Sequence, residues 1–97
     1  MPEYFLIACE IDRGGFSSER TFEIELPERG KLVGTAYVEY LLDEDKQPLD
    51  EDTPPFGDPI KGFVKCRKIR DVDAETVLIE VPSADVVHVS ADSLVPA

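Results

Sequence analysis

The amino-acid sequence predicts an all-β fold: a small six-stranded antiparallel barrel, SH3-like or related, with a two-sheet β-sandwich as the alternative. Short apolar runs with a two-residue alternation are separated by turns that contain glycine or proline. No stretch repeats apolar residues at helical spacing over three turns. Residues Thr21–Ala36 (TFEIELPERGKLVGTA) also align without a gap with Thr76–Ala91 (TVLIEVPSADVVHVSA), which suggests two duplicated β-β-β units. Closing such short strands into a barrel would remove their exposed edges.

The first unit is expected to contain three strands. Residues Tyr4–Ile11 are apolar and β-prone, and Gly14 and Gly15 then supply a turn. Ser18–Leu26 alternates strictly, with apolar residues on one face and threonine and glutamates on the other. After a Pro-Glu-Arg-Gly turn, Lys31–Leu42 predicts one long third strand with a bend at its small residues.

The second unit follows a long acidic segment, Asp43–Pro59, whose four prolines exclude a helix or a central strand. We expect this segment to be a flexible loop between the units. Strands are predicted at Ile60–Asp71, Thr76–Val81 and Val86–Ser90. In the first of these, Phe63 and Ile69 fall out of phase with the alternation, which predicts either a bulge or a second apolar contact. Residues Ala91–Val95 predict one short helical turn.

The composition predicts a single domain over residues 1–97. Ten basic and 21 acidic residues give a net charge of −11, and a surface this negative repels nucleic acids and anionic membranes. The N-terminal apolar run Tyr4–Cys9 is too short for a signal peptide or a membrane span. We therefore expect a cytoplasmic protein, monomeric or homodimeric, whose two cysteines are thiols.

The first candidate binding surface is the basic strand 60–70, which contains five basic residues and no acidic one. Alternation places Lys61, Lys65 and Arg67 on one face, and Phe63 lies among them for stacking. This pattern is typical of a patch that binds an acidic partner. The alternative interpretation is structural: cross-strand pairing of these cations with the glutamates of strand 18–26 (Glu19, Glu23 and Glu25), or their neutralisation by the acidic segment 43–59.

The second candidate is the connection formed by Arg13, Gly14, Gly15, Phe16 and Ser17. Its backbone amides, guanidinium and hydroxyl are groups that hold an anion. A β-hairpin needs the same glycines for its turn, so a purely structural role is the alternative.

The acidic segment resembles a calcium loop only at its start. Asp43, Asp45 and Gln47 have the spacing of early ligands, but Pro48 occupies the position that requires glycine, and Pro54 the position of the bidentate glutamate. We therefore predict no calcium site.

The remaining reactive side chains also predict no metal, cofactor or catalytic site. Cys9 and Cys66 occupy matched places in the two units, and His88 is the only histidine, which leaves too few ligands for zinc. We expect both thiols to be buried and His88 to point outward between two buried valines. No nucleophile elbow or triad pattern accompanies His88.

The sequence thus favours a non-enzymatic protein-interaction module with a protein partner. The alternative is a domain that binds a small anionic ligand or nucleic acid through the basic strand 60–70.

Overall fold

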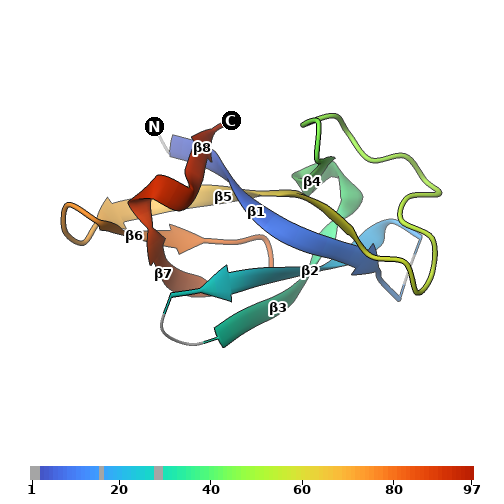
Figure 1. Ribbon diagram of the computed structural model, residues 1–97, viewed down its shortest axis with the longest axis horizontal. Helices are drawn as coiled ribbons and strands as arrows, with labels where there is room; N and C mark the ends of the chain where they lie inside the picture. The colour runs from blue at the N-terminus through green and yellow to red at the C-terminus, as the bar shows by residue number, and fades with distance from the viewer. Residues whose placement is uncertain (1–2, 16, 28–29) are drawn as a thin grey trace.

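The computed structural model describes residues 3–15, 17–27 and 30–97 of the chain. These residues form an all-β structure without an α-helix, as predicted (Figure 1). The elements are β1 (Glu3–Arg13), β2 (Glu19–Leu26), β3 (Gly30–Tyr37), the 3-10 turn η1 (Val38–Tyr40), β4 (Leu41–Asp43), β5 (Ile60–Asp71), β6 (Thr76–Glu80), β7 (Val86–Ser90), the 3-10 turn η2 (Ala91–Ser93) and β8 (Leu94–Pro96).

All strand pairs are antiparallel and belong to one sheet. Six strands follow the order β3-β2-β1-β5-β6-β7 and curl into an open half-barrel with β3 and β7 at its edges. The two short strands lie off this path, because β4 pairs with β5 and β8 pairs with β1.

The two halves of the chain have the same element order and interlock. Each half contains three strands, a 3-10 turn and a short strand that pairs with the first strand of the other half. The register shows this most clearly: Ile7 of β1 lies opposite Val64 of β5, Leu41 of β4 lies opposite Val64, and Leu94 of β8 lies opposite Ile7. Neither half therefore has a complete sheet without the other.

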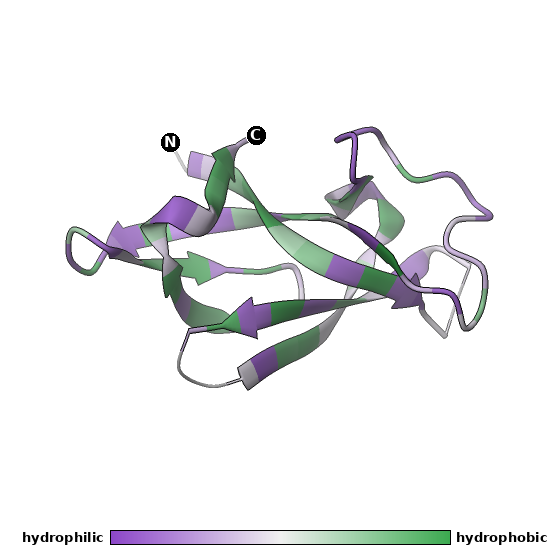
Figure 2. Ribbon diagram, in the orientation of Figure 1, coloured by the Kyte–Doolittle hydropathy of each residue, from purple (hydrophilic) through white to green (hydrophobic). Residues whose placement is uncertain are grey.

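The hydrophobic core lies on the concave side of the curled sheet. In β2 and in most of β1, buried residues alternate with more exposed ones, and Figure 2 shows the corresponding hydrophobic and hydrophilic bands. Burying one such aliphatic or aromatic side chain stabilises the fold by about 1.5–3 kcal/mol. The buried cluster consists of Ile7, Cys9, Ile11, Phe22, Ile24, Ala36, Leu41, Val64, Cys66, Val77, Ile79, Val81, Val87 and Val89.

The predicted long strand Lys31–Leu42 is wrong in one respect, because it breaks after Tyr37. The partner strand β2 begins at Glu19, opposite Tyr37, so β3 has no neighbour in β2 beyond this point. The chain turns through η1, where the Val38 amide donates a hydrogen bond to the Ser18 carbonyl at 2.9 Å. This turn redirects the chain from the β2 edge to the β5 edge, where β4 pairs.

Two smaller predictions are confirmed. The register of β5 against β6 shifts between Lys68 and Arg70, which is the predicted bulge. The predicted helical turn after β7 is present as η2. Within the described ranges, no helix has the length and hydrophobicity needed to cross a membrane.

Candidate functional site

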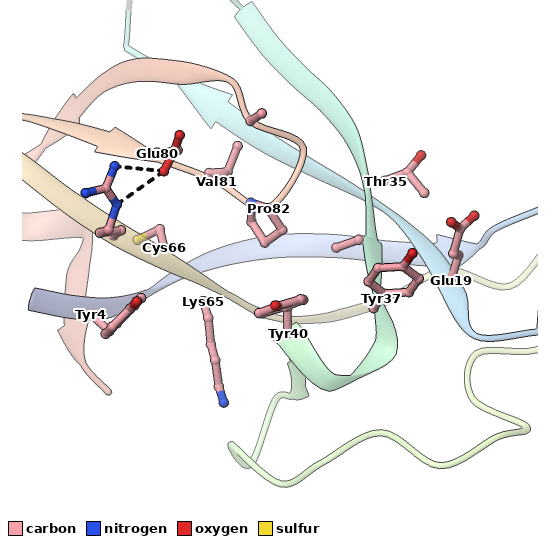
Figure 3. A pocket seen from close by; sticks show the side chains of 13 residues that line it. Tyr4, Glu19, Thr35, Tyr37, Tyr40, Lys65, Cys66, Glu80, Val81 and Pro82 are labelled. Atoms are coloured by element: carbon pink, nitrogen blue, oxygen red, sulfur yellow. Dashed lines mark hydrogen bonds and ion pairs between the residues drawn. The ribbon is translucent and has the colours of Figure 1, made fainter. Parts of the chain in front are cut away.

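A groove of about 570 Å³ opens along the edge of β5. On this edge β4 pairs with Gly62–Val64 and β6 pairs from Arg67 onward, so Lys65 and Cys66 lie in the gap between the two strands. The end of β3 and η1 form one wall, and the β6–β7 turn with Pro82 forms the other (Figure 3). The groove is therefore a consequence of the sheet topology.

All three tyrosines of the chain line this groove. Tyr4 comes from β1, Tyr37 from the end of β3 and Tyr40 from η1, and they are 56%, 55% and 43% exposed. Each tyrosine is next in the chain to a residue of the core. Tyr4 is followed by Phe5, which packs on the core, Tyr37 is preceded by the buried Ala36, and Tyr40 is followed by the buried Leu41. The core thus fixes the backbone from which each ring projects into solvent.

The charged residues of the groove come mainly from β5 and β6. Arg67 donates from Nε and Nη2 to Oε1 of Glu80 at 3.2 and 2.9 Å, directly across the two strands. Both side chains are substantially exposed, so we expect this pair to contribute less than about 1 kcal/mol. In the described part of the chain, Lys65 contacts no carboxylate, and Figure 3 shows it leaving β5 between Tyr4 and Tyr40 with its side chain extended away from both rings.

A second hollow of about 490 Å³ is the topological counterpart of the groove. It lies at the edge of β1, where β8 pairs with Phe5–Ile7 and β2 pairs from Glu10 onward. Lys61 and Phe63 line it together with four glutamates (Glu10, Glu23, Glu25 and Glu44).

The two openings differ most at their 3-10 turns. Tyr37 precedes η1 and Tyr40 ends it, whereas Ser90 precedes η2 and Ser93 ends it. Aromatic side chains thus mark only one of the two equivalent places.

The structure separates the residues of the basic-strand candidate. It places Lys65 and Arg67 in the tyrosine groove but Lys61 and Phe63 in the second hollow. The predicted pairing of these cations with the glutamates of β2 is wrong, because β1 lies between β2 and β5. Glu23 instead pairs with Lys31 of the neighbouring β3 at 3.3 Å.

The Arg13–Ser17 candidate forms the β1–β2 connection and contacts the acidic loop. Arg13 Nη1 donates to the Glu51 carbonyl at 3.0 Å, and its guanidinium lies 5.4 Å from the centre of the Phe56 ring. A side chain at Gly14 would come within 2.7 Å of the Glu19 carbonyl oxygen, so a close backbone approach requires glycine here. Gly15 and Ser17 are exposed, and Phe16 lies outside the described residues.

Arg20 is the residue that the sequence analysis missed. It is 0% exposed, although it carries a charge. Nε donates to the Thr53 carbonyl at 2.9 Å, Nη1 to those of Ser17 and Glu19 at 2.9 and 2.8 Å, and Nη2 to those of Asp50 and Glu51 at 3.4 and 3.1 Å. Burial, and then the charge of Arg13, lower the pKa of Arg20 from its ordinary value.

This arginine gives the acidic loop a fixed point of attachment at residues 50–53. In the same segment, the Thr53 hydroxyl and the Asp52 amide donate to the Asp50 carboxylate and hold its pKa below the ordinary value. The adjoining Pro54 is buried. The flexibility that the sequence predicts for this loop stays a prediction, and the attachment at residues 50–53 is the part of the loop that should move least.

The two cysteines and His88 lie as the sequence predicted. Cys9 and Cys66 are 8% and 2% exposed free thiols, and burial raises their pKa to about 12 and about 11. His88 is exposed, whereas the flanking Val87 and Val89 are buried. In the ranges that the structure describes, no group of three or more His, Cys, Asp or Glu residues is arranged to hold a metal ion.

Comparisons of the chain with protein-family models, with curated proteins and with solved structures found no match.

Proposed function

We propose that this protein is a non-enzymatic interaction module that binds a segment of a partner protein in the tyrosine groove. The observation that supports this proposal is that Tyr4, Tyr37 and Tyr40, from three separate elements, expose their rings in one groove. Tyrosine is enriched at protein interfaces, because it presents a large apolar area with few rotatable bonds and one polar hydroxyl.

The charges of the groove favour a partner segment with an acidic residue. Five of the ten basic residues of the chain lie in strand 60–70, and two of them, Lys65 and Arg67, line the groove. In a protein with a net charge of −11, this strand is a local positive feature on an acidic surface.

The thiol nearest to the groove supports a role in binding rather than in catalysis. Cys66 borders the groove, but it is almost fully buried and its raised pKa keeps it protonated at neutral pH. A protonated, buried thiol is a poor nucleophile.

An SH3-like barrel that arose by duplication is the evolutionary proposal that accompanies this function. The repeated element order and the two equivalent openings support it. In this proposal one opening acquired tyrosines for binding, while the other kept a serine, Ser93, at the corresponding end of its 3-10 turn.

The test is capture of partners from the native lysate with three tagged forms of the protein. The variant Tyr37→Ser/Tyr40→Ser introduces the residues that the other half carries before and at the end of its own 3-10 turn, so we expect it to fold. Val33→Ser is the control, because Val33 is 58% exposed on the same strand but does not line the groove. A specific partner should be retained by Val33→Ser and lost by the tyrosine variant.

The proposal is contradicted if the tyrosine variant captures the same partners in the same amounts as the wild type. Charge reversal at Lys65 and Arg67 tests the electrostatic part separately. It should weaken capture at low salt more than at high salt, because exposed charges are screened within about 8 Å at physiological ionic strength.

A further inference from the structure

We infer that the tyrosine groove takes an extended, proline-rich segment that carries an acidic residue beside Lys65. This inference rests on the proposed function and specifies the chemistry of its partner.

The polar atoms and rings of the groove complement a polyproline II segment. Prolines have no backbone N–H, so such a segment presents carbonyl acceptors and apolar rings, with its backbone open to solvent. Each tyrosine presents an aromatic face for a proline ring and a phenolic O–H that donates to a carbonyl. Aromatic-lined grooves that use this preformed, low-entropy conformation are a recurring mode of peptide recognition.

The opposite wall of the groove is also apolar. Val81, whose side chain is buried, and Pro82 form it at the start of the β6–β7 turn (Figure 3). The turn is held by hydrogen bonds from the Val81 amide to the Asp85 carbonyl at 3.1 Å and from the Ala84 amide to the Val81 carbonyl at 2.9 Å. A segment in the groove thus lies between the rings of Tyr37 and Tyr40 on one side and the turn with Pro82 on the other.

Addition of a β-strand is the competing way to bind an extended segment, and the edge of β5 is too short for it. Between Val64, the last residue that pairs with β4, and Arg67, the first that pairs with β6, only Lys65 and Cys66 remain free on this edge. Strands in proteins are usually at least about three residues long and need a row of backbone partners. On the β5 side of the groove, recognition through side-chain rings therefore fits better than backbone pairing. Backbone pairing with the open edge of β3, which borders the groove at Thr35 and Tyr37, is the competing outcome that the alanine peptide tests.

The acidic residue is inferred from the position of Lys65. Its ammonium contacts no carboxylate in the described ranges, whereas the neighbouring cation Arg67 is paired with Glu80. In Figure 3 Lys65 projects from β5 between the labelled Tyr4 and Tyr40, so a segment that contacts both rings crosses the base of its side chain, and the flexible stem lets the ammonium turn toward a carboxylate there. A carboxylate at this place forms an exposed ion pair, which strengthens binding by roughly 2- to 5-fold.

The protein contains its own reporter for this test. It has no tryptophan, and its three tyrosines all line the groove, so intrinsic tyrosine fluorescence comes from the proposed site alone. We would titrate the full chain with a capped peptide of about ten residues, rich in proline, free of aromatic residues and with one central glutamate. Two further probes are the same peptide with glutamine for glutamate, and one with alanines for the prolines.

We expect a saturable fluorescence change with the proline peptides and none with the alanine peptide. Tyr37→Ser/Tyr40→Ser should weaken binding about 10-fold or more, measured by calorimetry, because loss of stacking and of two donors costs at least about 1.4 kcal/mol. Lys65→Gln should abolish the preference for glutamate over glutamine. Val33→Ser should bind every peptide as the wild type does.

Amide chemical shifts of the wild type keep the test decisive if a variant fails to fold. Proline peptides should shift the amides of Lys65, Cys66 and Val38 more than those of the second hollow. Equal binding of the alanine peptide, no saturable change with any proline peptide, or shifts confined to the second hollow would overturn the inference. If the tyrosine variant still loses its cellular partner in the lysate experiment, the proposed function stands and only the proline-rich chemistry is wrong.

Discussion

Arg20 shows how this fold holds a charge in its interior through backbone carbonyls, since none of the ion pairs among the described residues involves it. Five backbone carbonyls accept from its guanidinium, two before or within β2 and three in the acidic loop. Carbonyl dipoles replace the lost hydration, and hydrogen bonds to a charged group are stronger than neutral ones. The residue therefore joins the β1–β2 connection to a segment that lies about thirty residues further along the chain.

Replacing Arg20 with methionine should destabilise the protein by about 2–4 kcal/mol and release the acidic loop. Methionine keeps the unbranched stem but leaves the carbonyls without donors. Urea denaturation measures the loss of stability, and amide hydrogen exchange at residues 50–53 measures the release of the loop.

Arg13→Met is the matched control for this experiment. Arg13 makes one guanidinium hydrogen bond to the same loop, and its buried Nε has no partner in the described part of the chain. We expect a loss below about 1 kcal/mol. Equal destabilisation by the two variants would show that Arg20 is not the principal attachment.

The buried thiols predict a loss of stability in alkali. Each folded-state pKa is raised above the ordinary value of 9.0, so each thiol contributes fully below pH 9.0, and this contribution is lost as the pH rises toward the folded value. Between pH 9.0 and 10 the free energy of unfolding should fall by about 1 kcal/mol for each thiol, because the unfolded thiol passes from half to almost complete ionisation over this range. In Cys9→Ala/Cys66→Ala, urea denaturation over this range should show a smaller slope, and an unchanged slope would contradict the prediction.

At the scale of elements, β5 is the strand on which the others depend. It pairs with β1 along one edge and with β4 and β6 in succession along the other. Gly62 allows the close approach of β4, because a Cβ at this position would overlap the Leu42 carbonyl oxygen and lie 2.7 Å from Cδ1 of Ile11. The position of β4 in turn fixes η1 and the tyrosine wall of the groove.

Gly62→Ala should therefore destabilise the protein by about 1–3 kcal/mol, because backbone atoms must move to admit the methyl group. It should also perturb the near-ultraviolet circular dichroism of the tyrosines. Gly15→Ala is the control, since a Cβ at Gly15 meets nothing within 4 Å. Wild-type stability of Gly62→Ala would show that β4 does not lie as closely on β5 as the structure indicates.

At the scale of the whole molecule, the interlocked halves leave the two ends of the chain next to each other. Phe5 of β1 lies opposite Pro96 of β8, and Figure 1 shows the termini together. The loop between the halves is exposed at Phe56 and Gly57, whereas Pro54, two residues earlier, is buried. A circular permutant in which the second half precedes the first can therefore keep every strand pair.

A circular permutant with a short glycine-rich linker from Ala97 to Met1 and new ends between Phe56 and Gly57 should therefore fold. We expect its stability to lie within about 2 kcal/mol of the wild type by urea denaturation. A permutant opened between Val64 and Lys65 should fail, because it divides the central strand β5. Failure of the first permutant would show that the loop connection is needed to bring the halves together.

The alternation of side chains made the faces of individual strands predictable. In β2 it placed Phe22 and Ile24 on the buried face, and in β7 it placed His88 outward, as found. The same alternation placed Arg20 on the buried face, so the pattern contained a signal for this residue. Its partners were not predictable, because they are carbonyls of a distant loop that lacks any periodic pattern.

The groove could not be predicted from local patterns. Tyr4, Tyr37 and Tyr40 come together only because η1 leads the chain from the β2 edge to β5, and because β1 pairs with β5 in one particular register. A shift of one residue in that register would turn every side chain of β1 to the other face. Neither fact is contained in the spacing of the tyrosines along the sequence.

The pairing of β8 with β1 has a consequence for synthesis in the cell. Leu6 is 3% exposed in the folded protein and lies opposite Val95, so its burial requires a segment that the ribosome makes about ninety residues later. At a translation rate of about 5–20 residues per second, β1 waits roughly 5 to 20 seconds for this partner. During that interval the nascent chain presents an unpaired apolar strand edge, which is the kind of surface that ribosome-associated chaperones bind.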